Sequence, residues 1–195
     1  LPRDLRRQRQ MCIRDSARSA WAMLRYSQLA HDADIKSSAI RKLDWCLKQE
    51  KEGHYLQCAF TKDAVPYTHT IAYAIRGMWE SGEILNRDEY RESAIRVAQS
   101  VISEMREDGF VPGQLGPKGA KRSSYCCLTG NCQLAIVWHK IYRATHNNGF
   151  QDGAKKALAY VMSQQDIKTA DLNRHGAIKG CQPIWGRYAP FSYPN

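Results

Sequence analysis

Two side chains able to exchange protons lie four residues apart in an apolar segment of the sequence. His69 and Tyr73 fall within residues 68–79, and side chains four apart on a helix share a face. On one face, an imidazole and a phenol could serve as the base and the acid of a single reaction. The alternative is that His69 is a buried structural histidine with a hydrogen-bonded partner.

Amide and cationic side chains are candidates for binding an anionic ligand. Asn131 and Gln133 occur at the start of a second apolar segment, where a neutral amide could bind the carboxylate of a uronic acid. Arg122, Lys179 and Arg187 lie in stretches with few acidic residues, so we expect them to attract anions. Aromatic side chains that could stack on sugar rings accompany these groups: Tyr67, Trp185 and Tyr188.

Together these groups favour chemistry at the carbon beside a uronate carboxylate. An amide on the carboxylate would acidify the adjacent C–H bond, and proton transfer would then permit β-elimination or C5 epimerisation. A glycosidase with two carboxylates is less well supported, because only Asp63 and Asp108 are expected nearby and they are not paired in sequence. Trp185 could instead be a core residue, and a noncatalytic protein that only binds saccharide is a further alternative.

A repeated helical hairpin must position these side chains. Ser-Ala-Ile-Arg occurs at 38–41 and again at 93–96, and each copy is followed by an acidic residue, a glycine and an aromatic residue, at 52–55 and 108–110. A weaker third copy starts at Gly153 and ends near Asp166. Such self-similarity is typical of repeat architectures.

Each copy predicts two helices joined by a short connection. The first helices are aromatic-rich, and two of them are apolar nearly all round, which indicates burial on most sides. The second helices are amphipathic, with apolar residues at i, i+3 and i+4. Inner and outer helices of these two kinds predict an all-α fold with about three hairpins of an (α/α)6-type barrel. The expected helices lie around residues 21–29, 35–47, 68–79, 90–101, 129–142 and 154–161.

Loop lengths indicate the functional face. Long connections lead from each second helix to the next first helix, at residues 53–66, 108–128 and from 166 to the chain end. Long loops in compact domains are usually functional, and all three would open at the N-terminal ends of the inner helices. We therefore expect the site at those ends.

Three segments carry a family resemblance. Residues 66–77 (PYTHTIAYAIRG), 127–133 (CLTGNCQ) and 176–186 (GAIKGCQPIWG) resemble a bacterial α/α-toroid family of the prenyltransferase/squalene-cyclase-repeat type, whose members often occur in exopolysaccharide gene clusters. The resemblance covers about residues 17–195 and implies a partial α/α toroid. Polysaccharide lyases, sugar epimerases and terpene cyclases share this toroid, so a terpenoid-cyclase-like or prenyltransferase-like activity is another alternative.

Four side chains raise the alternative of a zinc enzyme. Cys126, Cys127, Cys132 and His139 occur together, and lanthionine cyclases are α/α toroids with a Cys/Cys/His zinc site. Zinc sites usually use cysteines separated by a defined turn, and two adjacent cysteines do not easily bind one ion. We therefore expect no metal and no cofactor.

The first residues of the chain have a separate origin in our interpretation. Residues 6–16 (RRQRQMCIRDS) resemble the in-frame translation of a sequencing adapter, and the alternative is a basic arm that binds nucleic acid. We expect residues 1–16 to be an artefact and residues 17–195 to form one truncated toroid domain.

Composition narrows the classes of protein that remain. Of 195 residues, 43% are hydrophobic and 25% charged, which is a globular composition. No apolar run approaches the roughly 18 residues of a membrane span, and the net charge of +10 suits an anionic partner. We expect a cytoplasmic protein with no nucleic-acid partner, which binds or modifies an acidic poly- or oligosaccharide by lyase or epimerase chemistry in exopolysaccharide metabolism.

Overall fold

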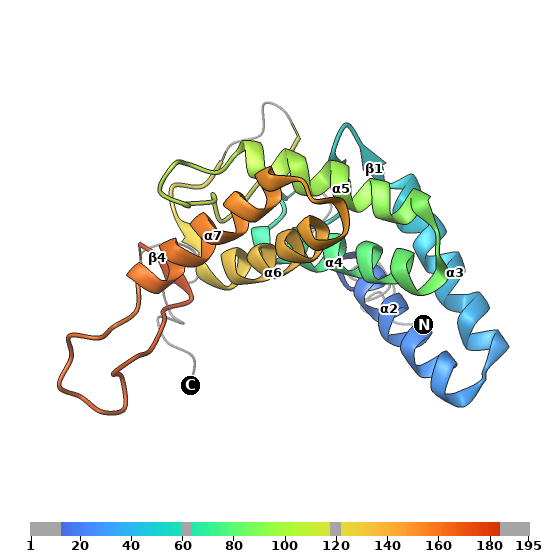
Figure 1. The fold of residues 1–195 in the computed structure, drawn as a ribbon, viewed down its shortest axis with the longest axis horizontal. Helices are drawn as coiled ribbons and strands as arrows, with labels where there is room; N and C mark the ends of the chain where they lie inside the picture. Colours follow the sequence, from blue (N-terminus) through green and yellow to red (C-terminus); the bar gives the residue numbers. More distant parts are fainter. Residues whose placement is uncertain (1–12, 60–63, 118–121, 184–195) are drawn as a thin grey trace, which may run out of the picture. The chain divides into compact units, whose positions relative to one another are not determined.

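The computed structural model describes residues 13–59, 64–117 and 122–183, and the side chains from Ala17 onward. These residues form six α-helices and four strands of two residues each, which confirms the predicted all-α class (Figure 1). Helix α2 begins at Ile13, inside the segment predicted to be an artefact, and residues 1–12 lie outside the described part. The elements in chain order are α2 (Ile13–Ala30), α3 (Ala33–Lys48), β1 (Glu50–Lys51), β2 (His54–Tyr55), α4 (Thr68–Leu85), α5 (Asp88–Ser103), β3 (Cys126–Cys127), α6 (Leu128–Thr145), α7 (Asn148–Ser163) and β4 (Cys181–Gln182).

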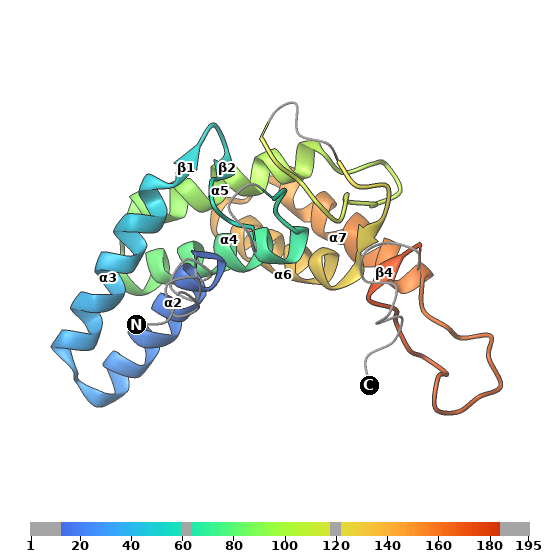
Figure 2. The same cartoon turned by 180° about the vertical axis from the view of Figure 1, so that it is seen from behind.

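The chain divides into two compact units. The first comprises residues 1–66 and 70–100, and the second residues 67–69 and 101–195. In the first unit α2 packs beside α3, and in the second α6 packs beside α7 (Figures 1 and 2). None of the helices in the described part of the chain combines the length and apolar character that a membrane crossing requires.

The three hairpin turns reverse the chain in the same way. His31, Asn86 and His146 each follow the first helix of a pair and adopt a left-handed backbone, with φ of 53°, 50° and 55°. A residue in this conformation commonly ends a helix and redirects the chain. In two of the turns, the following helix is capped at once, because Asp32 accepts a hydrogen bond from Ile35 N–H and Asn147 accepts one from Gly149 N–H.

The first and second helices differ in burial as the sequence predicts. Helix α4 buries side chains around most of its circumference, among them Ile71, Ala74, Ile75 and Trp79. Helices α3 and α7 bury a single face each, which for α3 consists of Ala39, Leu43 and Cys46. Helix α6 is buried in the same way as α4, whereas α2 buries one stripe, with Ala17, Ala20 and Leu24. Helices α4 and α6 are therefore inner helices, and α3 and α7 have the one-sided burial of outer helices.

A tight turn follows each outer helix and contains a glycine with positive φ. In the second copy Arg106 N–H donates to Phe110 O and Gly109 N–H to Arg106 O. The third copy repeats this pattern between Asp166 and residues 176–177, with Gly176 N–H bonded to Asp166 O at 2.8 Å. The third copy therefore does not end near Asp166 as predicted, because residues 167–175 are inserted into its turn and form the red-orange loop of Figures 1 and 2.

The glycines of the first two turns pack on the next outer helix at equivalent positions. Gly53 lies against the carbonyl oxygen of Arg96, eight residues into α5, and Gly109 lies against that of Lys156, eight residues into α7. The repeat predicted from sequence is thus also a repeat of packing contacts.

Candidate functional site

The N-terminal ends of two inner helices meet in the second unit. Thr68, the first residue of α4, is fully buried; its N–H donates to Gly113 O at 3.0 Å and its hydroxyl donates to Pro112 O. The first turn of α6 lies directly against it, because a Cβ built on Gly130 would be 3.0 Å from His69 N. This junction lies where the loop lengths predicted the site.

A small set of antiparallel pairings holds the junction together. Strand β3 pairs with β4, so that Cys126 faces Gln182 and Cys127 faces Cys181. Isolated bridges extend the pairing from Cys126 to Pro112 and from Gln114 to Tyr67. Within the second unit, backbone from two long connections therefore converges on Tyr67 and on the start of α6.

His69 provides an imidazole at this junction. It is half-buried, and its ring stacks on that of Tyr67, with centroids 5.7 Å apart and planes 20° apart. Its Nδ1 lies 3.7 Å from Sγ of Cys127. A partly exposed imidazole held between an aromatic ring and a thiol can exchange protons with a bound molecule.

Cys127 is both the partner of His69 and the N-cap of α6. Its sulfur accepts a hydrogen bond from Gly130 N–H at 3.4 Å, a role that serine or aspartate more often has. Burial raises the pKa of the Cys127 thiol to about 11, so the sulfur retains its proton at neutral pH. The sequence offered no signal for this contact, because cysteine is a rare cap and the two residues are 58 positions apart.

Asn131, predicted to bind a carboxylate, is fully buried. Its amide nitrogen donates to Gly109 O at 2.9 Å and to Ala157 O at 3.5 Å. No hydrogen-bond donor among the described residues reaches its Oδ1. The Asn131 side chain thus links α6 to the Gly109 turn and to α7, while Gln133 is half-buried on the face of α6 that also carries the exposed Thr129.

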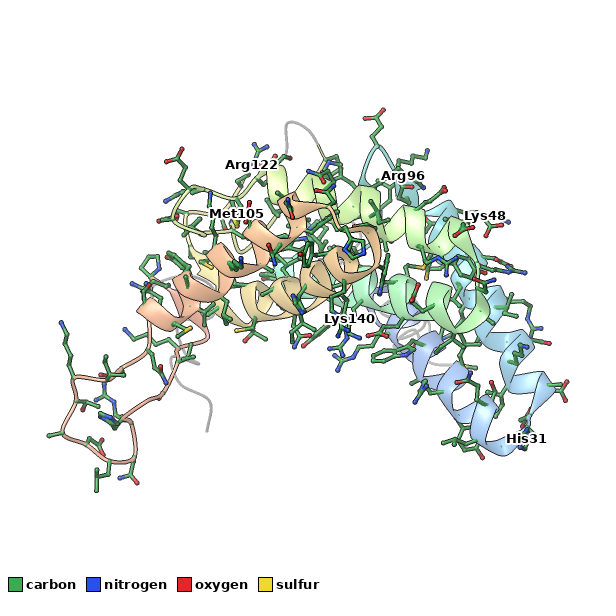
Figure 3. The ribbon with its side chains drawn as sticks, in the orientation of Figure 1. His31, Lys48, Arg96, Met105, Arg122 and Lys140 are labelled. Atoms are coloured by element: carbon green, nitrogen blue, oxygen red, sulfur yellow. The ribbon has the colours of Figure 1, made fainter. Side chains whose placement is uncertain are left out.

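Of the cationic side chains predicted to attract anions, Arg122 is engaged in an ion pair. Both nitrogens of the Arg122 fork donate to Glu104, and Arg122 projects from the loop beside Met105 (Figure 3). Lys179 is half-buried. Trp185, Arg187 and Tyr188, predicted to bind substrate, lie outside the described residues.

Tyr73, the predicted partner of His69, lies one turn further along α4. In the first unit the Arg18 guanidinium lies over its ring, 4.3 Å from the centroid. The two side chains share a helix face by their spacing, but their pairing stays a prediction.

Three acidic side chains in the loops of the second unit have structural partners, and Asp63, also expected near the site, lies outside the described residues. Glu104 binds Arg122, Asp166 binds Arg174 at 3.3 Å, and Asp108 accepts a hydrogen bond from Phe110 N–H. Such carboxylates do not form the closely spaced pair of a glycosidase.

The four candidate zinc ligands, Cys126, Cys127, Cys132 and His139, are not arranged as a zinc site requires. Cys126 and Cys127 are consecutive in β3, so their side chains point to opposite faces, and His139 is exposed further along α6. Across the described residues, no group of three His, Cys, Asp or Glu side chains is arranged to hold a metal ion.

Comparison with known proteins finds similarity in structure alone. No family model matches the sequence, and no curated protein matches it. A D-mannose isomerase aligns with a TM-score of 0.63 and 15% identity over 79% of this chain and 42% of its own. Cellobiose 2-epimerase from Bacillus thermoamylovorans aligns with a TM-score of 0.65 and 10% identity, over 79% of this chain and 42% of its own. A GH76 α-mannanase of Bacteroides thetaiotaomicron aligns with a TM-score of 0.62 and 14% identity, over 78% of this chain and 44% of its own.

These alignments define the class of fold. The chain has the fold of part of an α/α toroid, as its repeats predicted. It spans less than half the length of the solved structures that it matches, and at such low identity the similarity concerns the fold alone.

Proposed function

We propose that the whole protein acts on a saccharide and that His69 transfers a proton in the reaction. The observation that carries this proposal is the placement of a half-buried imidazole, stacked on Tyr67, where the first turns of α4 and α6 meet. Ligand sites in helical proteins commonly lie between neighbouring helices, as this junction does. The Tyr67 ring provides a flat apolar surface for one face of a sugar.

Proton transfer at carbon fits these residues better than glycoside hydrolysis does. Glu104, Asp166 and Asp108 are bound to arginines or backbone, whereas His69 has the ordinary chemistry of a general acid or base. Two of the three solved structures above are a sugar isomerase and a sugar epimerase by name, which supports the same class of reaction. Tyr73 is the proposed second proton-transfer group.

We further propose that the saccharide is acidic. Lys179, Gln133 and, outside the described residues, Arg187 would bind an acidic sugar, with Trp185 and Tyr188 stacking on its rings. Arg122 would contribute only by leaving Glu104. The predicted role in exopolysaccharide metabolism depends on this acidic substrate.

The test follows hydrogen exchange at carbon. The protein is incubated in D2O with mannose, cellobiose and a uronate-containing oligosaccharide, and proton NMR detects loss of the signal at C2 or C5. We expect exchange with at least one sugar, and exchange with the uronate alone would support the acidic substrate. His69→Gln should abolish the exchange.

The matched control is His146→Asn at the opposite end of α6. His146 is exposed with a left-handed backbone, which asparagine tolerates, so exchange should persist in this variant. Saccharide binding by the parent without any exchange would refute the enzymatic proposal and favour a noncatalytic saccharide-binding protein. Equal exchange by parent and His69→Gln would refute the role of His69.

A further inference from the structure

The contact between Cys127 and His69 can form with either the thiol or an imidazole N–H as donor. Sγ of Cys127 lies 3.7 Å from Nδ1 of His69, within the reach of a sulfur hydrogen bond, and 3.4 Å from Gly130 N. A backbone N–H can only donate, so the contact with Gly130 uses a lone pair of the sulfur. The thiol proton remains available for a hydrogen bond to Nδ1, 3.7 Å away.

The protonation state of the thiol agrees with this direction. Burial is the largest influence on Cys127 and raises its pKa to about 11, although backbone N–H groups of Gly130, His69 and Thr129 act in the opposite sense. At neutral pH the pair is therefore a thiol beside an imidazole, with the proton on sulfur.

We infer that the Cys127 thiol donates a hydrogen bond to Nδ1 of His69 and so holds the neutral imidazole in the tautomer with its proton on Nε2. A neutral imidazole has one donor and one acceptor nitrogen, so a donor at Nδ1 fixes the other nitrogen as N–H. The Tyr67 ring stacks on the imidazole, with 20° between the two planes, and so favours one orientation of the His69 ring. Cys127 is thus a positioning residue for His69.

This tautomer determines what His69 presents to a ligand. If the proposed function holds, on which this consequence rests, His69 first offers an Nε2–H donor, which would hydrogen-bond to a sugar carbonyl oxygen and polarise it. Abstraction of the carbon-bound proton would then fall to another group that is deprotonated beforehand, for which the phenolate form of Tyr73 is the proposed candidate.

The direct test is nitrogen NMR of the full chain labelled with 15N-histidine, without any sugar. The His69 signals are assigned by their loss in His69→Gln. We expect a pyridine-like Nδ1 and a pyrrole-like Nε2 in the parent at a pH where the imidazole is neutral. The opposite pattern, or an average of the two tautomers, would overturn the inference in the parent protein itself.

Variants separate the hydrogen bond from packing. Cys127→Ser keeps a donor and should keep the Nε2–H tautomer, whereas Cys127→Ala should give a mixture of tautomers. Cys132→Ala removes a half-buried thiol elsewhere on α6 and should leave the His69 signals unchanged. An unchanged tautomer in a folded Cys127→Ala protein would refute the role of Cys127.

A turnover measurement distinguishes this inference from the proposed function. Where exchange of a sugar proton is detected, Cys127→Ala should lower its rate about tenfold, the equivalent of one ordinary hydrogen bond, and Cys127→Ser should recover part of it. If no sugar exchanges, the proposed function fails, while the NMR result still decides the tautomer.

Discussion

Three equivalent glycines provide a graded test of the repeat. Gly53, Gly109 and Gly176 occupy the turns after the outer helices, with φ of 74°, 89° and 84°. Alanine at a positive φ costs about 1–2 kcal/mol wherever it occurs. We therefore expect the three Gly→Ala substitutions to share this cost and to differ only by what the new methyl group contacts.

Gly109→Ala should be the most destabilising of the three. Its Cβ would lie 2.1 Å from the carbonyl oxygen of Lys156 and 2.5 Å from the carbonyl carbon, both backbone atoms of α7 that cannot rotate away. The turn must shift, which disturbs the 2.9 Å bond from the buried Asn131 amide to Gly109 O. An unsatisfied buried amide adds about 1–3 kcal/mol, so we expect a total loss of about 2–5 kcal/mol in unfolding free energy.

Gly176→Ala is the matched control. The nearest atom to its Cβ would be Nε2 of Gln165 at 3.6 Å, an ordinary contact at the end of a flexible side chain. Only the backbone cost of about 1–2 kcal/mol should remain. Gly53→Ala should fall between the two, because Ser100 Cβ at 3.1 Å and Arg96 O at 3.3 Å would need only small adjustments.

Urea unfolding followed by circular dichroism measures all three variants beside the parent. The expected order of destabilisation is Gly109, Gly53, Gly176, and each kcal/mol should lower the melting temperature by about 2–4 °C in a chain of this size. Equal losses for Gly109→Ala and Gly176→Ala would refute the reasoning, since the backbone strain alone would then account for both.

Three further results are expected. Iodoacetamide should modify the half-buried Cys132 before Cys126 and Cys127, because burial raises the thiol pKa values of the latter two to about 12 and about 11. Modification of Cys126 and Cys127 should therefore accelerate as the pH rises. Equal modification rates of the three cysteines at neutral pH would contradict this prediction. Asp32→Ala should lower the unfolding free energy by about 1 kcal/mol through loss of the α3 cap, and an unchanged urea midpoint would show that the cap is dispensable. Arg122→Ala should leave the melting temperature unchanged, because the ion pair of Arg122 with Glu104 is exposed. A clear drop of the melting temperature in calorimetry would show that this ion pair anchors the loop.

The helices could be predicted because their signals are local. Apolar spacing at Ala39, Leu43 and Cys46 places one face of α3 in the core, and the recurrence of Ser-Ala-Ile-Arg identifies the repeat. The strands could not be predicted, because each has two residues and β3 exists only by pairing with β4, far along the chain. Their partners are set by tertiary structure and not by β-propensity.

The candidate site shows the same division between local and distant signals. The sequence places His69 at the start of an inner helix, but its contact with Cys127 depends on the meeting of two helix ends. Asn131 illustrates a signal that the sequence did contain. When α4 and α6 are aligned from their first residues in the structure, Asn131 falls at the position of the buried Ile71; the predicted starts at residues 68 and 129 align it with Thr70, which is also buried. Either alignment indicates a buried position, and the carboxylate-binding role of Asn131 stays a prediction.

The insertion at residues 167–175 offers a place to add new sequence to this protein. The turn that receives it is closed by hydrogen bonds between Asp166 and residues 176–177, so the two ends of the loop are already held together. The entropy of closing such a loop grows only slowly with its length, and Leu172 near its middle is 90% exposed. A peptide tag or a small reporter domain placed at this position would extend outward without altering the register of the helices.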